Sequence, residues 1–335
     1  MSRPSKRLAA VAVAVAFVAT AACKGDSHVS TLPTITTSFP STTVGSTTTT
    51  IAPPTTVTAP ISASTKVVVT ATGVVAPVVR INGDGSVAIR TPCENVVNVR
   101  RVTAVGPVDV LIDPGHGGSE DGAVGANGLA ERTVNLAVAK HIVEALAAAG
   151  LHSLLTRTGD YRVTLSERAN IAHAVNPKVL VSVHHNGGSD GPRDGPGTEV
   201  FYQHASADSR RLGGLIYEEV VAALSKYSGI PWQADTDAGV KPRLNTSGGD
   251  YYAMLREPAP VTSVLAELLF LSNPPEADLV AKPDVQRAEG QAVARGIVRF
   301  LTTSDPGSGY VEPYPRTEPA GGGGGLAGCT DPPLE

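Results

Sequence analysis

Apolar residues between positions 108 and 301 follow two alternating patterns. Short apolar runs bounded by turn residues predict buried β-strands, and longer stretches with an apolar residue at every third or fourth position predict amphipathic helices. The helical pattern is clearest at residues 131–149, where apolar residues recur every fourth position until Gly150. Because strands alternate with helices, we expect an α/β fold with a mainly parallel sheet and helices on both faces.

The two patterns assign an element to most of this region. Strands are expected from Val108 onward and at residues 151–156, 179–183, 198–202, 251–255 and 261–265, and helices at residues 131–149, 164–175, 208–224 and 283–301. Thr164 is expected to begin the second helix, because Thr with Glu three residues later is a capping-box signature. Residues 229–249 show no regular pattern, and we expect a substrate-facing loop there.

The N-terminal segment predicts no folded core. Residues 1–22 place basic residues before an apolar run that ends in small residues, which is typical of a signal peptide, so we expect export. Cleavage after Ala21 and lipidation of Cys23 both stay open, because the residues before Cys23 resemble a lipobox with threonine where leucine is usual. Residues 23–65 are rich in Thr, Ser and Pro and predict a flexible linker.

Two further segments flank the main domain, which we assign to residues 107–303. Residues 66–106 contain short β-branched runs separated by turn residues and predict a small β appendage. Residues 304–335 include a run of glycines and predict a flexible tail. An oxidising compartment permits a disulfide between Cys93 in the appendage and Cys329 in the tail, but the sequence does not test its geometry.

Composition narrows the classes of partner. The 27 Lys and Arg residues nearly balance the 31 Asp and Glu residues, and aromatic residues make up 4% of the chain. Neither value is typical of a nucleic-acid-binding protein, so we expect no nucleic-acid partner. The cysteines form no C-x-x-C pair, so any metal site must use histidines and carboxylates. We expect a monomer.

Polar residues stand where three of the predicted strands end. His116 follows the first strand in a glycine-rich turn, His184 follows the strand at 179–183, and Glu267 follows the strand at 261–265. Ligands of open α/β sheets collect at this edge, and two histidines with one glutamate are typical of a catalytic zinc site. Alternatives remain: His116 could only cap its turn, Glu131 could only cap the next helix, and Glu267 could bind the metal.

Several motifs together resemble the zinc-dependent N-acetylmuramoyl-L-alanine amidases, which cleave bacterial peptidoglycan. They include IDPGHGG at 112–118, GLAERTVNL at 128–136, LLTR at 154–157, LSERAN at 165–170, VSVHHN at 181–186 and VLAELLFLSN at 264–273. The resemblance implies a mixed sheet flanked by helices and a zinc amidase catalytic domain. It also implies that His116, Glu131 and His184 bind one Zn²⁺ and that Glu267 is the catalytic carboxylate. Leu269 departs from the family, which usually has glycine there, and could crowd the site.

Other residues have weaker interpretations. Asn186 and Arg256 are candidate substrate contacts, whereas Arg157 and Arg168 are expected to brace the fold. His185 should face the side of the strand opposite to His184, because side chains alternate along a strand.

The resemblance implies hydrolysis of the amide bond between N-acetylmuramic acid and L-alanine, in cell-wall remodelling or turnover. Two alternatives are a zinc peptidase that cuts within the stem peptide and a non-catalytic peptidoglycan-binding module. We expect the protein in the cell envelope, at the wall or at the outer face of the cytoplasmic membrane, with a lipid on Cys23 as one way to tether it.

Overall fold

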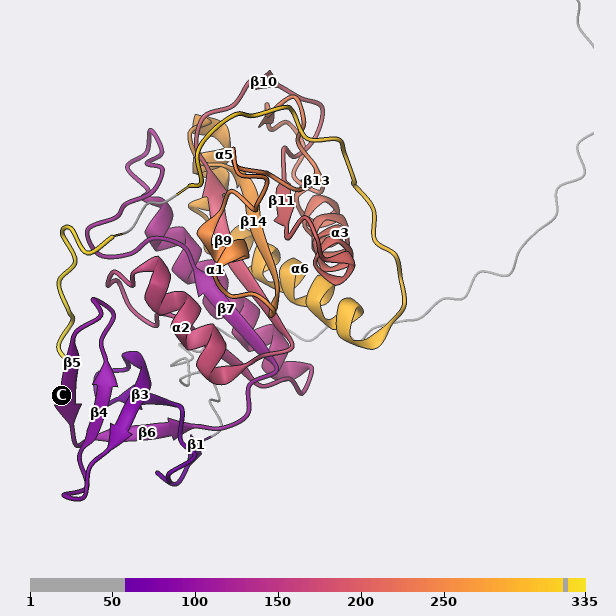
Figure 1. Cartoon of the computed structure of the whole chain (residues 1–335). Helices are drawn as coiled ribbons and strands as arrows, with labels where there is room; N and C mark the ends of the chain where they lie inside the picture. Colours follow the sequence, from indigo (N-terminus) through magenta and orange to yellow (C-terminus); the bar gives the residue numbers. More distant parts are fainter. Residues whose placement is uncertain (1–57, 322–324) are drawn as a thin grey trace, which may run out of the picture. The chain divides into compact units, whose positions relative to one another are not determined.

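A mixed β-sheet forms the centre of the main domain in the computed structural model, which describes residues 58–321 and 325–335 (Figure 1). In the order of the sheet, its strands are β13 (Val240–Lys241), β11 (Glu199–Tyr202), β14 (Thr262–Phe270), β9 (Val179–Asn186), β7 (Val110–Pro114) and β8 (Ser153–Leu155). The four strands from β14 to β8 are parallel, and β11 is antiparallel to β14. The sheet is therefore mixed and mainly parallel, as predicted.

Helices cover both faces of this sheet. They are α1 (Glu131–Ala148), α2 (Leu165–Val175), α3 (Ala207–Leu224), α4 (Ala253–Arg256), α5 (Pro274–Val280) and α6 (Pro283–Thr302). Side chains of α1, α3, α5 and α6 pack on one face, where Val181 is fully buried. Side chains of α2 and α4 pack on the other face, where Leu180, the residue before Val181, is fully buried. Alternation along β9 thus fills two separate cores.

The appendage is a second sheet. Its strands, in sheet order, are β1 (Thr58–Ala59), β6 (Val102–Val105), β2 (Val67–Thr70), β3 (Val75–Ile81), β4 (Val87–Arg90) and β5 (Val96–Val99). All neighbouring pairs are antiparallel. Val67 and Val75 pack against the α2 side of the main sheet, so the appendage shares a core with the main domain. Strand β1 lies in the segment predicted as linker.

The expected strand at residues 251–255 is wrong, because residues 253–256 form α4. Met254 and Leu255 are buried in two different hydrophobic clusters on the α2 side of the main sheet. A single helical turn permits this, because it directs neighbouring side chains in different directions. Short apolar runs do not distinguish such a turn from a strand.

The expected loop at 229–249 contains two short strands. Strand β13 forms the edge of the main sheet, and β12 (Gln233–Ala234) pairs with β10 (Gly191–Pro192). Helix α5 also lies outside the predicted elements, and β14 continues through Glu267 to Phe270.

The described parts of the tail lie against the domain rather than apart from it. After α6 the chain runs past β13, where the amide of Val240 donates to the carbonyl oxygen of Gly309 (2.8 Å). Arg316 forms an ion pair with Asp237 (3.0 Å). The tail, yellow in Figure 1, ends beside the appendage. The prediction of a flexible tail rested on composition alone. Composition indicates the local preference of a segment, but it gives no information about contacts with distant residues.

A disulfide joins the tail to the appendage. It links Cys93 to Cys329, whose Cα atoms are 5.7 Å apart. Next to it, the carboxylate of Asp331 accepts hydrogen bonds from the Cys93 amide (2.9 Å) and the Thr91 hydroxyl (2.8 Å). The end of the chain is therefore held by covalent and polar contacts together.

The predicted signal peptide, Cys23 and most of the linker lie outside the described residues. Among the helices that the structure describes, none is both long and apolar enough to cross a membrane.

Candidate metal centre

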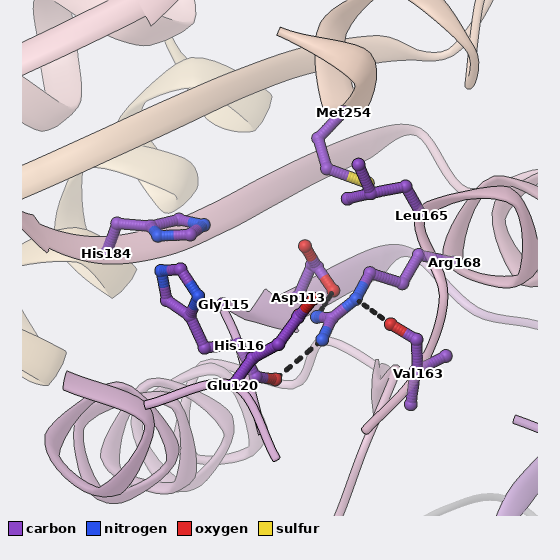
Figure 2. Close-up of a pocket in the computed structure, with 9 residues that line it drawn as sticks. All are labelled: Asp113, Gly115, His116, Glu120, Val163, Leu165, Arg168, His184 and Met254. Atoms are coloured by element: carbon purple, nitrogen blue, oxygen red, sulfur yellow. Dashed lines mark hydrogen bonds and ion pairs between the residues drawn. The ribbon is translucent and has the colours of Figure 1, made fainter. Parts of the chain in front are cut away.

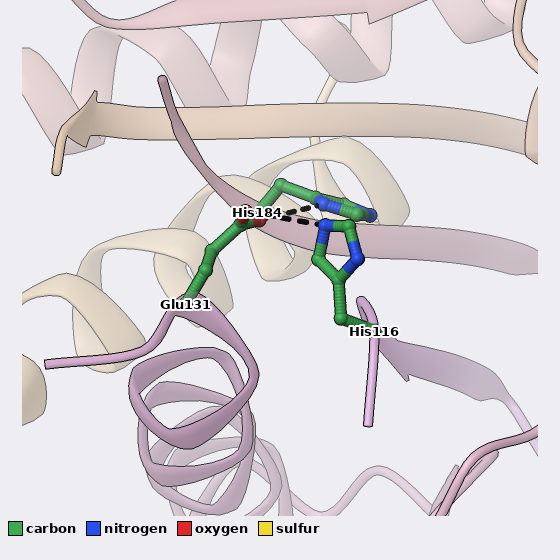
Figure 3. A group of neighbouring side chains, drawn as sticks. All are labelled: His116, Glu131 and His184. Atoms are coloured by element: carbon green, nitrogen blue, oxygen red, sulfur yellow. Dashed lines mark hydrogen bonds and ion pairs between the residues drawn. The ribbon is translucent and has the colours of Figure 1, made fainter. Parts of the chain in front are cut away.

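Three predicted ligands meet at the carboxyl edge of the main sheet. His116 follows β7, His184 is near the end of β9, and Glu131 is the first residue of α1 (Figure 3). The Glu131 carboxylate lies between the imidazoles, with Oε2 3.1 Å from His116 Nε2 and Oε1 2.9 Å from His184 Nδ1. One donor atom from each residue lies within 4.8 Å of the others. Two imidazole nitrogens and one carboxylate oxygen at this spacing fit a zinc ion.

Glycines make this convergence possible. A Cβ atom on Gly115 would lie 2.1 Å from Cε1 of His184, and one on Gly122 would lie 2.3 Å from Oε2 of Glu131. His116 itself has a φ of 59°, in the left-handed region that few side chains adopt. The glycine-rich turn is therefore required by the close approach of the side chains.

Neither Glu131 nor His116 acts only as a cap. No side chain caps the N-terminus of α1, and the Glu131 carboxylate instead accepts hydrogen bonds from the backbone amides of Ala123 (2.8 Å) and His185 (3.1 Å). His116 directs its ring at Glu131 and at a pocket. The capping alternatives are thus removed by the geometry.

Two buried arginines brace the turn. Arg168 donates to Asp113 Oδ1 (2.5 Å) and to the carbonyl oxygen of His116 (2.7 Å). Arg157 donates to the carbonyl oxygens of Pro114 (3.0 Å) and Gly115 (2.8 Å). Both arginines use their guanidinium groups on the protein itself, in agreement with the bracing role predicted for them.

Electrostatics prepare the ligands for a cation. Burial raises the pKa of Glu131, but hydrogen bonds with His116 and His184 outweigh burial and hold this pKa well below its ordinary value. Burial lowers the pKa of His184. A carboxylate and a neutral imidazole are the protonation states that metal binding needs.

Glu267 faces the same edge. It lies in register with His184 on parallel β9 and with Glu199 on antiparallel β11, so the three side chains share one face of the sheet. Within the described part of the chain, its buried Oε2 atom has no hydrogen-bond partner. Burial and then the charges of Glu131 and Glu199 raise the pKa of Glu267 well above its ordinary value. Glu267 therefore holds a proton more tightly than an exposed carboxyl group does.

A pocket of about 150 Å³ opens beside the two histidines (Figure 2). Its lining residues are Asp113, Gly115, His116, Glu120, Val163, Leu165, Arg168, His184 and Met254. Three of these residues have apolar side chains: Val163, Leu165 and Met254. Glu120 and Met254 were not predicted. Glu120 lies just after the motif that contains His116 but fits none of the sequence patterns, and Met254 lies far from both histidines along the chain.

An ion pair that the sequence did not predict involves Glu199, which lies in register with Glu267 on the neighbouring strand β11. The fully buried ammonium group of Lys241 binds Glu199 and also donates to Asp237 Oδ1 (2.6 Å). Glu199, Asp235 and Asp237 are close enough to hold a cation, and Lys241 already supplies one. Glu199 stands in a predicted strand, but Lys241 and Asp237 lie in residues 229–249, where the sequence shows no regular pattern, so the sequence did not indicate this pair.

The two candidate substrate contacts have partners within the protein. Asn186 Nδ2 donates to Glu199 Oε2 (2.6 Å), and Arg256 donates to the carbonyl oxygens of Asp250 (2.9 Å) and Tyr251 (3.0 Å). Neither lines the pocket, and their contact with substrate stays a prediction.

Two expectations about neighbouring residues are settled by their positions. Leu269 is fully buried in the core under the helices and does not line the pocket, so it does not crowd the site. His185 points to the face opposite His184, where it contacts Asn135 of α1 and Glu289 of α6.

Two histidines and one glutamate, with a second glutamate beside them at the carboxyl edge of an α/β sheet, are typical of the metal-dependent hydrolases. Residues 110–299, more than half of the chain, match the family model described as N-acetylmuramoyl-L-alanine amidase. The chain belongs to this family.

Individual relatives are similar over the same region. YqiI of Bacillus subtilis, which is described as an uncharacterized protein, is 35% identical over 190 residues, which cover 56% of this chain and 82% of YqiI. The N-acetylmuramoyl-L-alanine amidase LytC of Bacillus subtilis is 30% identical over 191 residues, which cover 57% of this chain and 35% of LytC. The crystal structure of an N-acetylmuramoyl-L-alanine amidase from Clostridium difficile 630 matches with a TM-score of 0.50 and 25% identity, covering 59% of this chain and 99% of that chain.

Proposed function

We propose that the protein hydrolyses the amide bond between N-acetylmuramic acid and L-alanine in peptidoglycan, using one Zn²⁺ held by His116, Glu131 and His184. The observation that carries the proposal is the convergence of these three side chains, with Glu267 beside them, in a chain of the amidase family. When bound, zinc supplies a Lewis acid that polarises the scissile carbonyl and lowers the pKa of water toward about 7.

The protein's own residues supply positioning and proton transfer. Arg157 and Arg168 hold the turn that carries His116, whose ring lines the pocket. Glu267 takes a proton from the attacking water and gives it to the leaving amine of L-alanine. A carboxyl group with a pKa raised above its ordinary value suits both steps, because it is a stronger base toward water and can still return the proton to the leaving amine.

The test is mass spectrometry of peptidoglycan after digestion. An amidase releases intact stem peptides that begin at L-alanine. Shortened stems would show a peptidase that cuts within the stem. Binding without release would show a peptidoglycan-binding module, and either of these outcomes contradicts the proposal.

Peptidoglycan amidases act outside the cytoplasm, and we infer the same location for this chain. Two features support the inference: the signal-like residues 1–22 and the Cys93–Cys329 disulfide, which suits an oxidising compartment. The proposed protein is a monomer that is either freely secreted or tethered by a lipid on Cys23. Detergent partitioning of the wild type and Cys23→Ala tests the tether, because a lipoprotein enters the detergent phase and Cys23→Ala does not.

A further inference from the structure

A row of buried polar side chains runs from helix α6 to the metal centre. Glu289 on α6, His185 on β9 and Asn135 on α1 are each at most 1% exposed. They lie where the helices otherwise pack on the sheet through apolar side chains. Burying polar groups costs free energy unless they bind one another, and the proton transfer proposed above uses none of the three.

The hydrogen bonds fix how Asn135 is oriented. Its Nδ2 atom donates to Glu131 Oε1 (3.1 Å) and to the carbonyl oxygen of Gly115 (3.3 Å). A carbonyl oxygen and an ionised carboxylate only accept, so the amide nitrogen must face them and the amide oxygen must face His185. His185 Nδ1 lies 2.7 Å from that oxygen and is therefore the donor.

The other nitrogen of the His185 ring is held as well. Its Nε2 lies 3.3 Å from Glu289 Oε2. A hydrogen bond forms whichever group carries the proton, because Nε2–H donates to a carboxylate and a protonated carboxyl donates to bare Nε2. Gly290 permits this approach of α6 to α1, since a Cβ atom there would lie 2.6 Å from Cβ of His141.

We propose that Glu289, His185 and Asn135 form a relay that fixes the orientation of the Glu131 carboxylate for the metal. All three are then positioning residues for zinc binding, although none gives an atom to the metal. Hydrogen-bond partners of metal ligands set the direction of the donor atom, and their loss typically costs about 10- to 100-fold in metal affinity. The relay rests on the proposed zinc site and adds to it one further element, helix α6 with Glu289.

The experiment measures zinc affinity by competition with a chromophoric chelator, and the unfolding temperature of the metal-free protein, on the full chain. The variants are Asn135→Leu, Glu289→Leu and the double variant, which remove one or both links. Glu289→Gln is the conservative variant, because a glutamine amide still forms a hydrogen bond with His185 Nε2. Glu276→Leu is the matched control, since Glu276 is equally buried but binds the amides of Gln233 and Phe270.

Asn135→Leu should weaken zinc binding by roughly 10- to 100-fold, and Glu289→Leu by about 10-fold. The double variant should bind zinc no more weakly than Asn135→Leu alone, because the two residues act through one chain of contacts. Glu289→Gln should retain most of the affinity. Glu276→Leu should lower the unfolding temperature and leave zinc affinity unchanged.

Wild-type zinc affinity in folded Glu289→Leu, or losses that simply add in the double variant, would overturn the relay while leaving the zinc site intact. A wild-type protein that binds no zinc would instead overturn the proposed function, and the relay with it. If Asn135→Leu does not fold, the comparison of Glu289→Leu with Glu289→Gln decides.

Discussion

Two glutamates at one edge of the sheet, the buried Glu131 and the partly buried Glu267, have opposite electrostatic properties. Hydrogen bonds with two histidines hold the pKa of Glu131 well below its ordinary value. Burial and two neighbouring carboxylates raise the pKa of Glu267 well above its ordinary value. The same side chain therefore favours the ionised form at one position and the protonated form at the other, because the environment selects the protonation state. This difference supports the roles proposed for the two residues.

Gly115 should be among the least replaceable residues of the site. A Cβ atom at this position would overlap the imidazole of His184, so Gly115→Ala must displace either the ring or the turn. We expect zinc affinity to fall by at least about 10-fold, as when the support of a metal ligand is lost. The measurement is zinc affinity by chelator competition.

Gly191→Ala is the control for this substitution, because a Cβ atom at Gly191 meets nothing within 4 Å. Equal zinc affinity in Gly115→Ala and Gly191→Ala would show that the close approach to His184 is not needed.

The sequence predicted the three side chains that converge at the candidate metal centre, but it did not predict their hydrogen-bond partners. His116 and His184 follow apolar runs that predict strands, so the sequence predicted their place at the edge of the sheet. The contacts between Asn135, His185 and Glu289 join residues far apart in the sequence, and no local pattern marks them. Sequence patterns report periodicity, and only packing brings such partners together.

At the scale of elements, long periodic segments were predicted well. Helix α1 begins at the predicted Glu131 and ends one residue before its predicted end, because its apolar stripe packs on the sheet. Short elements were missed, including the two-residue strand β13 that carries Lys241. So short a strand has no periodicity of its own and is fixed by pairing with β11.

The capping box predicted at Thr164 is half formed. The Thr164 hydroxyl accepts from the Glu167 amide (3.2 Å), but the Thr164 amide donates to the carbonyl oxygen of Pro92 in the appendage (3.1 Å). Glu167 therefore does not return the second bond of the box and is left buried beside Arg90 (3.8 Å). The hydrogen bond from the Thr164 amide to Pro92 thus takes the place of the bond that this amide would donate to Glu167 in a complete capping box.

Glu167 should make stability depend on pH. Burial raises the pKa of Glu167 from 4.5 to about 7, partly opposed by a hydrogen bond from Asn170. The folded state then holds this proton more tightly than the unfolded state, so the stabilisation is complete below pH 4.5 and is lost as pH rises to about 7. The free energy of unfolding of the wild type should fall by on the order of 3 kcal/mol across this window. Glu167→Gln should not show this fall, because glutamine does not titrate.

The measurement is urea unfolding at several pH values for the wild type and Glu167→Gln. Parallel pH profiles of the two proteins would show that Glu167 titrates alike in the folded and unfolded states, contrary to this expectation.

At the scale of the whole molecule, the tail connects segments that are far apart in the chain. It contacts β13, carries Arg316 to Asp237 and ends at the disulfide to the appendage. Arg162 donates to the carbonyl oxygen of Gly325 (2.7 Å), close to the pocket residue Val163. The sequence indicated that the two cysteines could form a disulfide, but it did not indicate the polar contacts that accompany the bond.

Cys329→Ser should lower the free energy of unfolding by roughly 2–5 kcal/mol, because the bond closes a loop across 236 positions and restricts the unfolded chain. Urea unfolding with and without reductant measures the effect. Cys93→Ser should show the same loss, and the double variant no further loss. Stability of the wild type that does not change on reduction would contradict a stabilising role for the disulfide.

Zinc content and amidase turnover, measured on the same preparations of Glu267→Gln and Glu131→Gln, test the assigned roles most directly. Glu267→Gln should retain zinc, because His116, Glu131 and His184 remain, and should lose at least about 10²–10⁴-fold in turnover, because an amide cannot accept the proton of water. Glu131→Gln should lose zinc and turnover together. Loss of zinc in Glu267→Gln with full zinc in Glu131→Gln would show that the ligand and the proton carrier have been exchanged.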